Sequence, residues 1–281
     1  MGISSRRSKI GNGFTVFLLV ILGMMMAFPF YYTLIQSIKP SEELFQFPPR
    51  LYVIRPTGEH YTELFQLMSN MWVPFSRYLF NTLFISIVGT LLHVFLAGMA
   101  AYPLAKHKFP GRNLIFWLIV TALMFSTHVT AIPNYLVMSH LGWLDNYLSL
   151  IIPAIAKPMG LFLMKQFMEQ VPDSLIEAAR IDGASEFRIF ATIVMPSVKP
   201  AWLTLIIFCF QDLWNLQGSN YIYSENLKTL PYALSQISAA GISRAGATAA
   251  VAVIMMIVPI TIFILCQSNI IETMVSSGIK E

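Results

Sequence analysis

Residues 174–196 read SLIEAARIDGASEFRIFATIVMP, a polar and charged segment set between two long apolar runs. Pro172 interrupts the helix before it, and Ser174 with Glu177 fits the capping box that starts a new helix. That helix can run for only about two turns before Gly183, whose missing Cβ allows the left-handed conformation that ends helices. The segment therefore begins with a short helix and a sharp glycine corner.

A second helix is expected on the far side of this corner. Ser185 can cap it, and it should cover residues 186–195 until Pro196 stops it. Two helices joined at a fixed angle form a rigid knob. Its charged side chains are expected on the solvated faces: Glu177, Arg180, Asp182, Glu186 and Arg188. By composition alone an ordinary amphipathic loop is an equal alternative, but the spacing favours a docking element.

The composition places the chain in a membrane. Hydrophobic residues make up 56% of its 281 residues and charged residues only 11%, against about a quarter charged in soluble proteins. The mean hydropathy is +0.64. The net charge of +4 is small and the basic residues form no stripe, which excludes a nucleic-acid partner. We therefore expect an all-α polytopic membrane protein.

Six stretches are long enough to cross a bilayer, whose apolar core takes about twenty residues of helix. They leave a cytoplasmic tail over 1–13, an outer segment over 39–77 and the knob-bearing loop over 172–196, within one transmembrane domain over 14–281. The six expected spans lie near 14–35, 79–104, 114–138, 148–167, 201–217 and 247–267. The first exceeds the length of a signal peptide and lacks its small-residue cleavage site, so we expect it to be retained.

Lysine and arginine set the expected orientation. The tail carries three and the short connection 106–112 carries three more, whereas the connection 140–146 carries none. By the positive-inside rule, the tail and 106–112 are cytoplasmic and 140–146 is outside. Six spans then return the C-terminus to the cytoplasm, and the knob between spans four and five lies on that side.

The wording and spacing of the knob resemble the EAA loop of bacterial ABC-importer permeases. Glu177-Ala178-Ala179 is followed after three residues by Gly183 and, after nine more, by Ile193 and Pro196. The segment is similar to that of the carbohydrate-uptake branch, the maltose-type inner permease subunits. Met195 stands where the family usually has Leu, a residue of similar volume.

Further landmarks extend the resemblance over residues 14–281. They comprise a polar pair at the start of the second span, the turn after that span, and positions around the later spans and the tail. These landmarks are Asn81-Thr82, 101–106, 109–112, 132–135, 141–143, Trp214-Asn215, Gln267, Gly278 and Lys280. Pro103 departs from the family, which has Ala there.

The resemblance implies the transmembrane permease subunit of an ATP-driven importer in a bacterial cytoplasmic membrane. Implied partners are a second homologous permease subunit, two ATPase subunits that hold ATP and Mg²⁺, and an extracytoplasmic solute-binding protein. The implied substrate is a di- or oligosaccharide, and no cofactor, metal or catalysis is expected on this chain. The residues expected to couple to the ATPase are Glu177, Ala178, Ala179, Asp182, Gly183 and Pro196.

A polar cluster ends the fifth span. Gln211, Asp212, Trp214 and Asn215 follow an apolar run over 203–210. Ionisable groups at membrane depth are expensive and usually face a cavity or a partner, and an aromatic ring beside amides and a carboxylate suits sugar binding. Gln211, Trp214 and Asn215 share a helix face and are expected to line the substrate path. Asp212 is expected at its edge or against the partner subunit. The alternative is an interfacial anchor or helix glue.

Catalytic and phosphate-binding motifs are absent from the sequence. Without a G-x-x-x-x-G-K-[ST] loop the chain cannot bind and split ATP by itself, and no H-E-x-x-H or G-x-S-x-G is present. Cys209 and Cys266 lie in apolar runs and are interpreted as small buried residues. Two other functions stay open. One is an ion-gradient-driven secondary transporter, against which the lack of a half-to-half repeat argues; the other is a membrane-embedded enzyme or scaffold.

The scarcity of basic residues in the expected spans bears on the substrate. A phosphate ligand such as glycerol-phosphate would favour Arg or Lys in the path, and only Lys157 lies near the outer end of a span. A neutral oligosaccharide is therefore preferred over glycerol-phosphate as the substrate.

Overall fold

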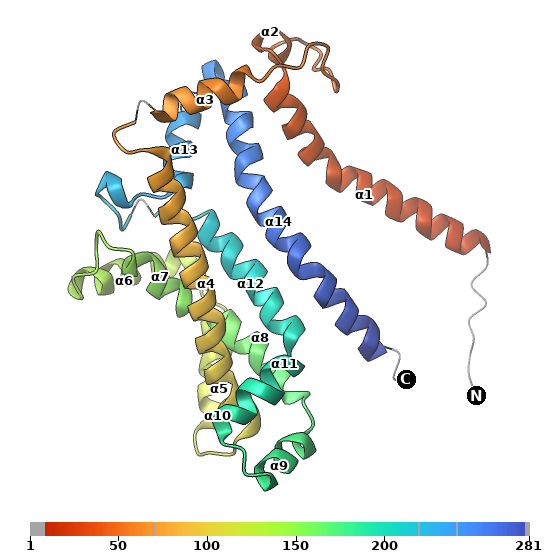
Figure 1. Ribbon diagram of the computed structural model, residues 1–281, viewed down its shortest axis with the longest axis vertical. Coiled ribbons are helices and arrows are strands. Elements are labelled where there is room, and N and C mark those ends of the chain that lie inside the picture. Colours follow the sequence, from red (N-terminus) through yellow and green to blue (C-terminus); the bar gives the residue numbers. More distant parts are fainter. Residues whose placement is uncertain (1–8, 70, 219, 240, 279–281) are drawn as a thin grey trace. The chain divides into compact units, whose positions relative to one another are not determined.

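The computed structural model describes residues 9–69, 71–218, 220–239 and 241–278 (Figure 1). Every regular element in these ranges is a helix, which confirms the expected all-α class. The α-helices are α1 (Lys9–Ile38), α2 (Ser41–Leu44), α3 (Glu59–Ser69), α4 (Phe75–Lys106), α5 (Arg112–Ala122), α6 (Thr127–His140), α7 (Leu148–Ile155), α8 (Pro158–Glu169), α9 (Asp173–Ile181), α10 (Glu186–Ile189), α11 (Met195–Ser197), α12 (Lys199–Trp214), α13 (Leu230–Ser238) and α14 (Ala245–Gly278). The other described elements are a π-helix, η1 (Phe190–Val194), and two 3-10 turns, η2 (Glu225–Leu227) and η3 (Gly241–Arg244).

Four helical segments of the described chain are long and apolar enough to cross a membrane without a sharp bend. They are Gly13–Ile38, Phe75–Lys106, Leu148–Glu169 and Ala245–Gln267. Two more spans arise if bent helix pairs are counted: α5 with α6, bent by 109°, and Glu186–Ser197 with α12, bent by 80°. The described residues thus provide four to six spans, and each of the six expected segments has a counterpart among them.

The third expected span, 114–138, is wrong as a continuous helix. α5 ends at Ala122 and α6 begins at Thr127, with Ser126 in an extended conformation at its N-cap. The Ser126 hydroxyl accepts the His128 amide at 3.3 Å, which stabilises the start of a new helix. No Gly or Pro lies in this turn, so the apolar sequence did not indicate a break in the helix.

Contacts within the chain group it into two compact units. Their limits are 1–70 with 236–254, and 71–235 with 255–281. In the first unit the buried Lys39 ammonium donates to the Arg50 carbonyl at 2.6 Å, and His60 Nε2 lies 2.7 Å from the Lys39 carbonyl. A Cβ on Gly246 would overlap the His60 ring, so this glycine permits the contact between α3 and the start of α14.

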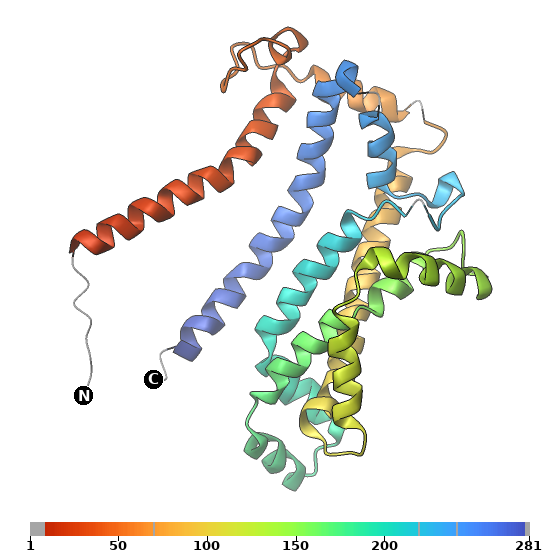
Figure 2. The same cartoon turned by 180° about the vertical axis from the view of Figure 1, so that it is seen from behind.

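In the second unit α4 is the central helix and packs along α7, α8 and α12 (Figure 1 and Figure 2). Two glycines allow these close approaches. A Cβ on Gly89 would come within 2.6 Å of Leu213, and one on Gly160 would overlap His93. His93 Nδ1 lies 3.0 Å from the Ile155 carbonyl, which joins α4 to α7. Small residues at helix crossings are the common means of tight packing in membranes.

Two apolar cores hold the second unit together. One joins α4 to α7, α12 and the segment after α12, through Ile85, Leu150, Ile151, Leu213 and Ile222. The other joins α4, α8 and α12 to the segment from α9 to η1, through Ala101, Met164, Met168, Ile176, Ala179, Ile189, Val194 and Leu205. The second core therefore anchors the predicted knob to the spans.

The buried polar pair at the start of α4 holds the segment between α12 and α13. Asn81 Nδ2 donates to the Asn226 carbonyl at 2.9 Å, and the Tyr147 hydroxyl donates to Asn81 Oδ1 at 2.7 Å. Thr82 Oγ1 accepts the Leu230 amide at 2.7 Å. Both side chains are buried and hydrogen-bonded, so this pair stabilises the fold.

A carboxylate latch closes the same end of the second unit. Asp145 has a φ of 57°, the one non-glycine residue of the described chain in the left-handed region. Its carboxylate accepts the Ser224 hydroxyl and the amides of Ser224 and Tyr223, at 2.8 and 2.9 Å for the amides. These donors, the Ser224 hydroxyl above all, hold the pKa of Asp145 below its ordinary value. We call Asp145, Tyr223 and Ser224 the Asp145 latch.

Candidate functional site

The knob has a left-handed corner at the predicted glycine. α9 is followed by Gly183, whose φ is 78°. The Ala184 amide donates to the Ala179 carbonyl and the Gly183 amide donates to the Arg180 carbonyl, both at 3.0 Å. This pair of bonds is the Schellman motif, which ends helices at a left-handed glycine. The predicted corner is confirmed.

The start of α9 differs from the prediction. Pro172 takes the N-cap position without a side-chain cap bond, so Ser174 lies inside the first turn and the predicted capping box with Glu177 is wrong. The helix starts earlier, at Asp173, whose carboxylate accepts a hydrogen bond from Lys106 Nζ at 2.7 Å. This ammonium lowers the pKa of Asp173. The negative charge of Asp173 in the first turn also complements the helix dipole.

Beyond the corner, Ser185 caps the second helix as predicted. Its hydroxyl accepts the Arg188 amide at 3.4 Å. The helix then passes from α10 through the wider π-turns of η1 into α11. This π-helix was not predicted from the sequence.

The second helix ends later than predicted. Pro196 lies in the first turn of α11 and the helix continues to Ser197, so the prediction that Pro196 stops it is wrong. The helix α11 that contains Pro196 directly follows the wider π-turns of η1. The chain bends instead at Val198, and Trp202 Nε1 donates to the Met195 carbonyl at 3.1 Å across the bend.

α9 separates a buried face from an exposed one. Ile176 and Ala179 are buried in the apolar core, whereas Ala178 is exposed. The predicted exposure of the charged residues is confirmed for Glu177, Arg180, Asp182, Glu186 and Arg188. Three apolar side chains are exposed among them: Leu175, Ile181 and Phe187. Ile181 is 86% exposed, and we call these three residues the apolar tip.

The end of α4 holds the base of the knob. The Lys106 side chain is only 5% exposed. Its ammonium donates to the Val171 carbonyl at 2.5 Å and the Glu169 carbonyl at 3.4 Å, besides the Asp173 carboxylate. A cation is favoured at carbonyls beyond a helix C-terminus, here that of α8. Arg112, at the start of α5, pairs with the Glu169 carboxylate at 3.3 Å.

The same end of α4 also binds the second helix of the knob. The Tyr102 hydroxyl donates to Glu186 Oε2 at 2.8 Å, and His107 Nε2 lies 3.3 Å from the same oxygen. Arg180 Nε donates to Glu186 Oε1 at 2.8 Å, which raises the pKa of Arg180. Arg180 from before the glycine corner and two residues at the end of α4 thus converge on Glu186, which lies after the corner. We call Tyr102, Lys106 and His107 the α4 clamp.

Sequence reasoning missed the α4 clamp. In the sequence, Lys106 and His107 stood out only as parts of the basic connection 106–112, and Tyr102 only as part of the landmark 101–106. The contacts depend on bringing α4 beside α8, which no local pattern reveals. The available signal was Tyr102 and Lys106 four residues apart, on one helix face.

The polar cluster at the end of α12 is partly open. Gln211, Asp212 and Asn215 are exposed. Asn215 Nδ2 donates to the Gln211 carbonyl at 2.9 Å, which satisfies one of the carbonyls at the helix end. Gln211 and Asn215 therefore lie close together on an open side of the second unit.

Trp214, which the sequence predicts to line the substrate path with Gln211 and Asn215, does not share their open side in this structure. Its side chain is 0% exposed. The indole Nε1 donates to the Met255 carbonyl at 3.0 Å, and the ring stacks on Phe210 with centroids 5.9 Å apart. Trp214 therefore fixes α12 against α14 from inside.

Asp212 forms an ion pair with Lys157. Lys157 Nζ and Asp212 Oδ2 are 2.6 Å apart, and the two side chains are 37% and 59% exposed. The prediction that Lys157 lies near the outer end of its span is wrong, because it is the tenth of the 22 residues of Leu148–Glu169. It is the N-cap of α8 in an extended conformation, as expected before Pro158.

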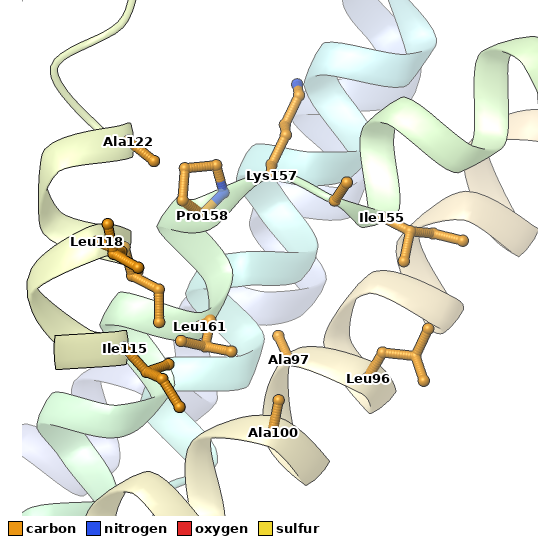
Figure 3. Close-up of a pocket in the computed structure, with 12 residues that line it drawn as sticks. Leu96, Ala97, Ala100, Ile115, Leu118, Ala122, Ile155, Lys157, Pro158 and Leu161 are labelled. Carbon is orange, nitrogen blue, oxygen red and sulfur yellow. The ribbon is translucent and has the colours of Figure 1, made fainter. Parts of the chain in front are cut away.

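An apolar groove of about 490 Å³ lies beside Lys157. α4, α5 and the ends of α7 and α8 form its walls. Its lining includes Leu96, Ala100, Ile115, Leu118, Ile155 and Leu161. Figure 3 shows the Lys157 side chain extending away from these apolar side chains. The groove is thus an apolar surface, and the ammonium is turned to Asp212 instead.

Residues 93–276 match the family described as binding-protein-dependent transport system inner membrane component. The chain belongs to this family. It is 30% identical over 265 residues to the arabinooligosaccharides transport system permease protein AraQ of Bacillus subtilis, covering 93% of each chain. It is 34% identical over 206 residues to the sn-glycerol-3-phosphate transport system permease protein UgpE of Yersinia enterocolitica, covering 70% of this chain and 71% of the other.

A solved structure has the same fold. It is the crystal structure of a bacterial ABC transporter involved in the import of the acidic polysaccharide alginate. One of its chains matches with a TM-score of 0.78 at 23% identity, covering 95% of this chain and 99% of that chain. As a binding-protein-dependent transport system component, the chain is a multi-pass membrane protein and a transport permease. The family match includes the knob, the α4 clamp and the polar cluster.

Proposed function

We propose that this chain is the transmembrane permease subunit of an ATP-driven importer that carries a di- or oligosaccharide across a bacterial cytoplasmic membrane. The observation that carries the proposal is the knob, an exposed apolar tip on a rigid helix–corner–helix that the α4 clamp ties to the spans. A loop that only connected two spans would need neither feature. Family membership and the similarity to an arabinooligosaccharide permease support the sugar.

The knob is the docking site for an ATPase subunit. Glu177, Ala178 and Asp182 offer exposed side chains beside the apolar tip, so they are placed for direct contact. Ala179 is buried, so it couples by seating α9 on the core. Gly183 sets the corner, and Pro196 lies in the helix that leads back to α12. Movement of the knob would pass through the α4 clamp into α4.

The complete importer contains more than this chain. One knob serves one ATPase subunit, so a second homologous permease subunit and two ATPase subunits complete the complex, and ATP and Mg²⁺ are held by the ATPase. An extracytoplasmic binding protein delivers the sugar. The N- and C-termini lie in the cytoplasm, on the side of the knob, as the distribution of lysine and arginine requires.

The substrate path runs past the end of α12. Gln211, Asp212 and Asn215 provide amide and carboxylate groups that can exchange hydrogen bonds with sugar hydroxyls. Trp214 supports them from inside the unit and does not itself face the path in this conformation.

A glycerol-phosphate importer is the second candidate. The similarity to UgpE and the presence of Lys157 within a span favour it. The ion pair with Asp212 argues against it, because that carboxylate already occupies the position a phosphate would take.

Cross-linking tests the docking site. Ile181→Cys, carrying a photoactivatable cross-linker, should capture the ATPase subunit when the tagged chain is expressed in its native cell. The matched control is Tyr223→Cys, an exposed aromatic position in the Asp145 latch, which should capture no ATPase. Equal capture from both positions, or none from Ile181→Cys, would overturn the assignment.

A further inference from the structure

Lys157 lies near the middle of a segment long and apolar enough to span a membrane, and its partner Asp212 lies near the end of α12. Lys157 is the tenth residue of the 22-residue segment Leu148–Glu169, nine residues from one end and twelve from the other. At about 1.5 Å of rise per residue, it lies roughly 14 Å from the nearer end, close to the middle of an apolar core of about 30 Å. Charges at this depth are expensive and are retained where they face a partner or a water-filled cavity.

The two charges face an open side of the unit. Their side chains are partly exposed despite the depth, and the exposed amides of Gln211 and Asn215 follow on the same helix end. On its other side, Lys157 borders the apolar groove, from which its side chain extends away (Figure 3). Lys157 thus lies at the boundary between the apolar groove and a polar surface. The ion pair lies on the polar surface, with Gln211 and Asn215.

We infer that the Lys157–Asp212 pair lines the transport path and restricts it to uncharged substrates. This inference rests on the proposed function and adds the two residues that select substrates by charge. The pair has no net charge, and its ammonium and its second carboxylate oxygen, Oδ1, can donate to and accept from hydroxyl groups. An anionic substrate would have to displace Asp212 from Lys157 against the repulsion of that carboxylate. A cationic substrate would meet the ammonium in the same way.

Asp212 is the residue that sets this selectivity. Removing its charge leaves Lys157 as an uncompensated cation at the path, which attracts carboxylates and phosphates. Removing the charge of Lys157 has the opposite effect. Removing both charges restores neutrality. The original pair, the two single variants and the double variant therefore form a double-mutant cycle, which separates charge selection from damage to the fold.

Thiol reagents of opposite charge measure the selectivity without knowledge of the natural substrate. The reporter is Asn215→Cys, three residues from Asp212 and therefore on the same helix surface. It is placed in the complete importer in liposomes, with Cys209 and Cys266 replaced by alanine. The probes are an anionic and a cationic methanethiosulfonate, and each rate is divided by that of a free thiol in solution.

The neutral pair should give equal normalised rates for the two probes. With Asp212→Asn the anionic probe should gain roughly tenfold over the cationic one, and with Lys157→Gln the cationic probe should gain by the same factor. The double variant and the swapped pair, Lys157→Asp with Asp212→Lys, should return to equality. Leu118→Cys, in the apolar groove, is the control and should react with neither probe.

Two results would overturn the inference. An unreactive Asn215→Cys would show that this surface is not on an aqueous path. Rates that stay equal in every background would show that the pair does not select charge. ATP-driven sugar uptake is measured separately in liposomes that carry the unsubstituted chain, so absence of uptake there would count against the proposed function instead.

Discussion

The Tyr102 hydroxyl donates to Glu186 Oε2 at 2.8 Å, so the end of the central helix α4 is bound directly to the first turn of α10. The neighbouring Lys106 binds the other half of the knob through Asp173. A docking partner that moved the knob would therefore move α4, the helix on which α7, α8 and α12 pack. The α4 clamp is thus the structural link between the knob and the spans.

Weakening the α4 clamp should uncouple ATP hydrolysis from transport. Tyr102→Phe removes one hydrogen bond to a carboxylate, and Lys106→Met removes the cation at the end of α8. We expect both variants to reach the membrane and to keep ATPase activity, with a several-fold lower ratio of sugar transported to ATP hydrolysed. Lys108→Met, an exposed lysine in the same connection, is the control, and its ratio should be unchanged. A normal ratio in both clamp variants would contradict this mechanical role.

Gly183→Ala should disturb the corner through its backbone alone. A Cβ there meets no atom within 4 Å, so the cost is that of a left-handed φ, roughly 1 kcal/mol or more. The variant should insert in the membrane and uncouple ATPase activity from uptake. Gly142→Ala is the matched control, because Gly142 has a φ of 66° and equal space but lies far along the chain from the knob. Normal coupling in Gly183→Ala, or equal uncoupling in the control, would count against the docking assignment.

Burial separates Trp214 from its polar neighbours. Trp214→Ala should leave a cavity and destabilise the protein by about 3–5 kcal/mol, with lower yield and thermal stability as the readout. Asn215→Ala is exposed and should change stability by no more than about 0.5 kcal/mol, while lowering the rate of sugar uptake. If Trp214→Ala were stable and lost only sugar uptake, Trp214 would be assigned to the substrate path instead.

The features predicted correctly from the sequence are those that single residues and their near neighbours along the chain determine. The Gly183 corner and the Ser185 cap follow from single residues with special conformational or hydrogen-bonding properties, and both are confirmed. The break between α5 and α6 was missed because no Gly or Pro marks it. The burial of Trp214 and the Lys157–Asp212 pair depend on how α12 packs against other helices. Helical spacing alone places residues on a face but does not say which face is covered.

The Asp145 latch should weaken in acid. Its donors lower the pKa of Asp145 in the folded protein below the ordinary value of 3.8. The stabilisation is therefore complete above the unfolded pKa and is lost as the pH falls through the folded value. Thermal unfolding in detergent between pH 6 and about 3 should show a fall in midpoint that is smaller in Asp145→Asn. Asparagine keeps the tolerance for a left-handed φ, so equal pH dependence in both proteins would exclude the latch as the cause.

Sugar uptake into liposomes with a controlled energy source tests the central claim most directly. The liposomes contain this chain, its partner permease and the ATPase, with the binding protein and its sugar outside and ATP inside. Uptake should require ATP, the ATPase and the binding protein, should survive ionophores that abolish ion gradients, and should fall sharply with Gly183→Ala. Uptake by this chain alone, driven by an ion gradient and independent of ATP, would contradict the account and identify a secondary transporter.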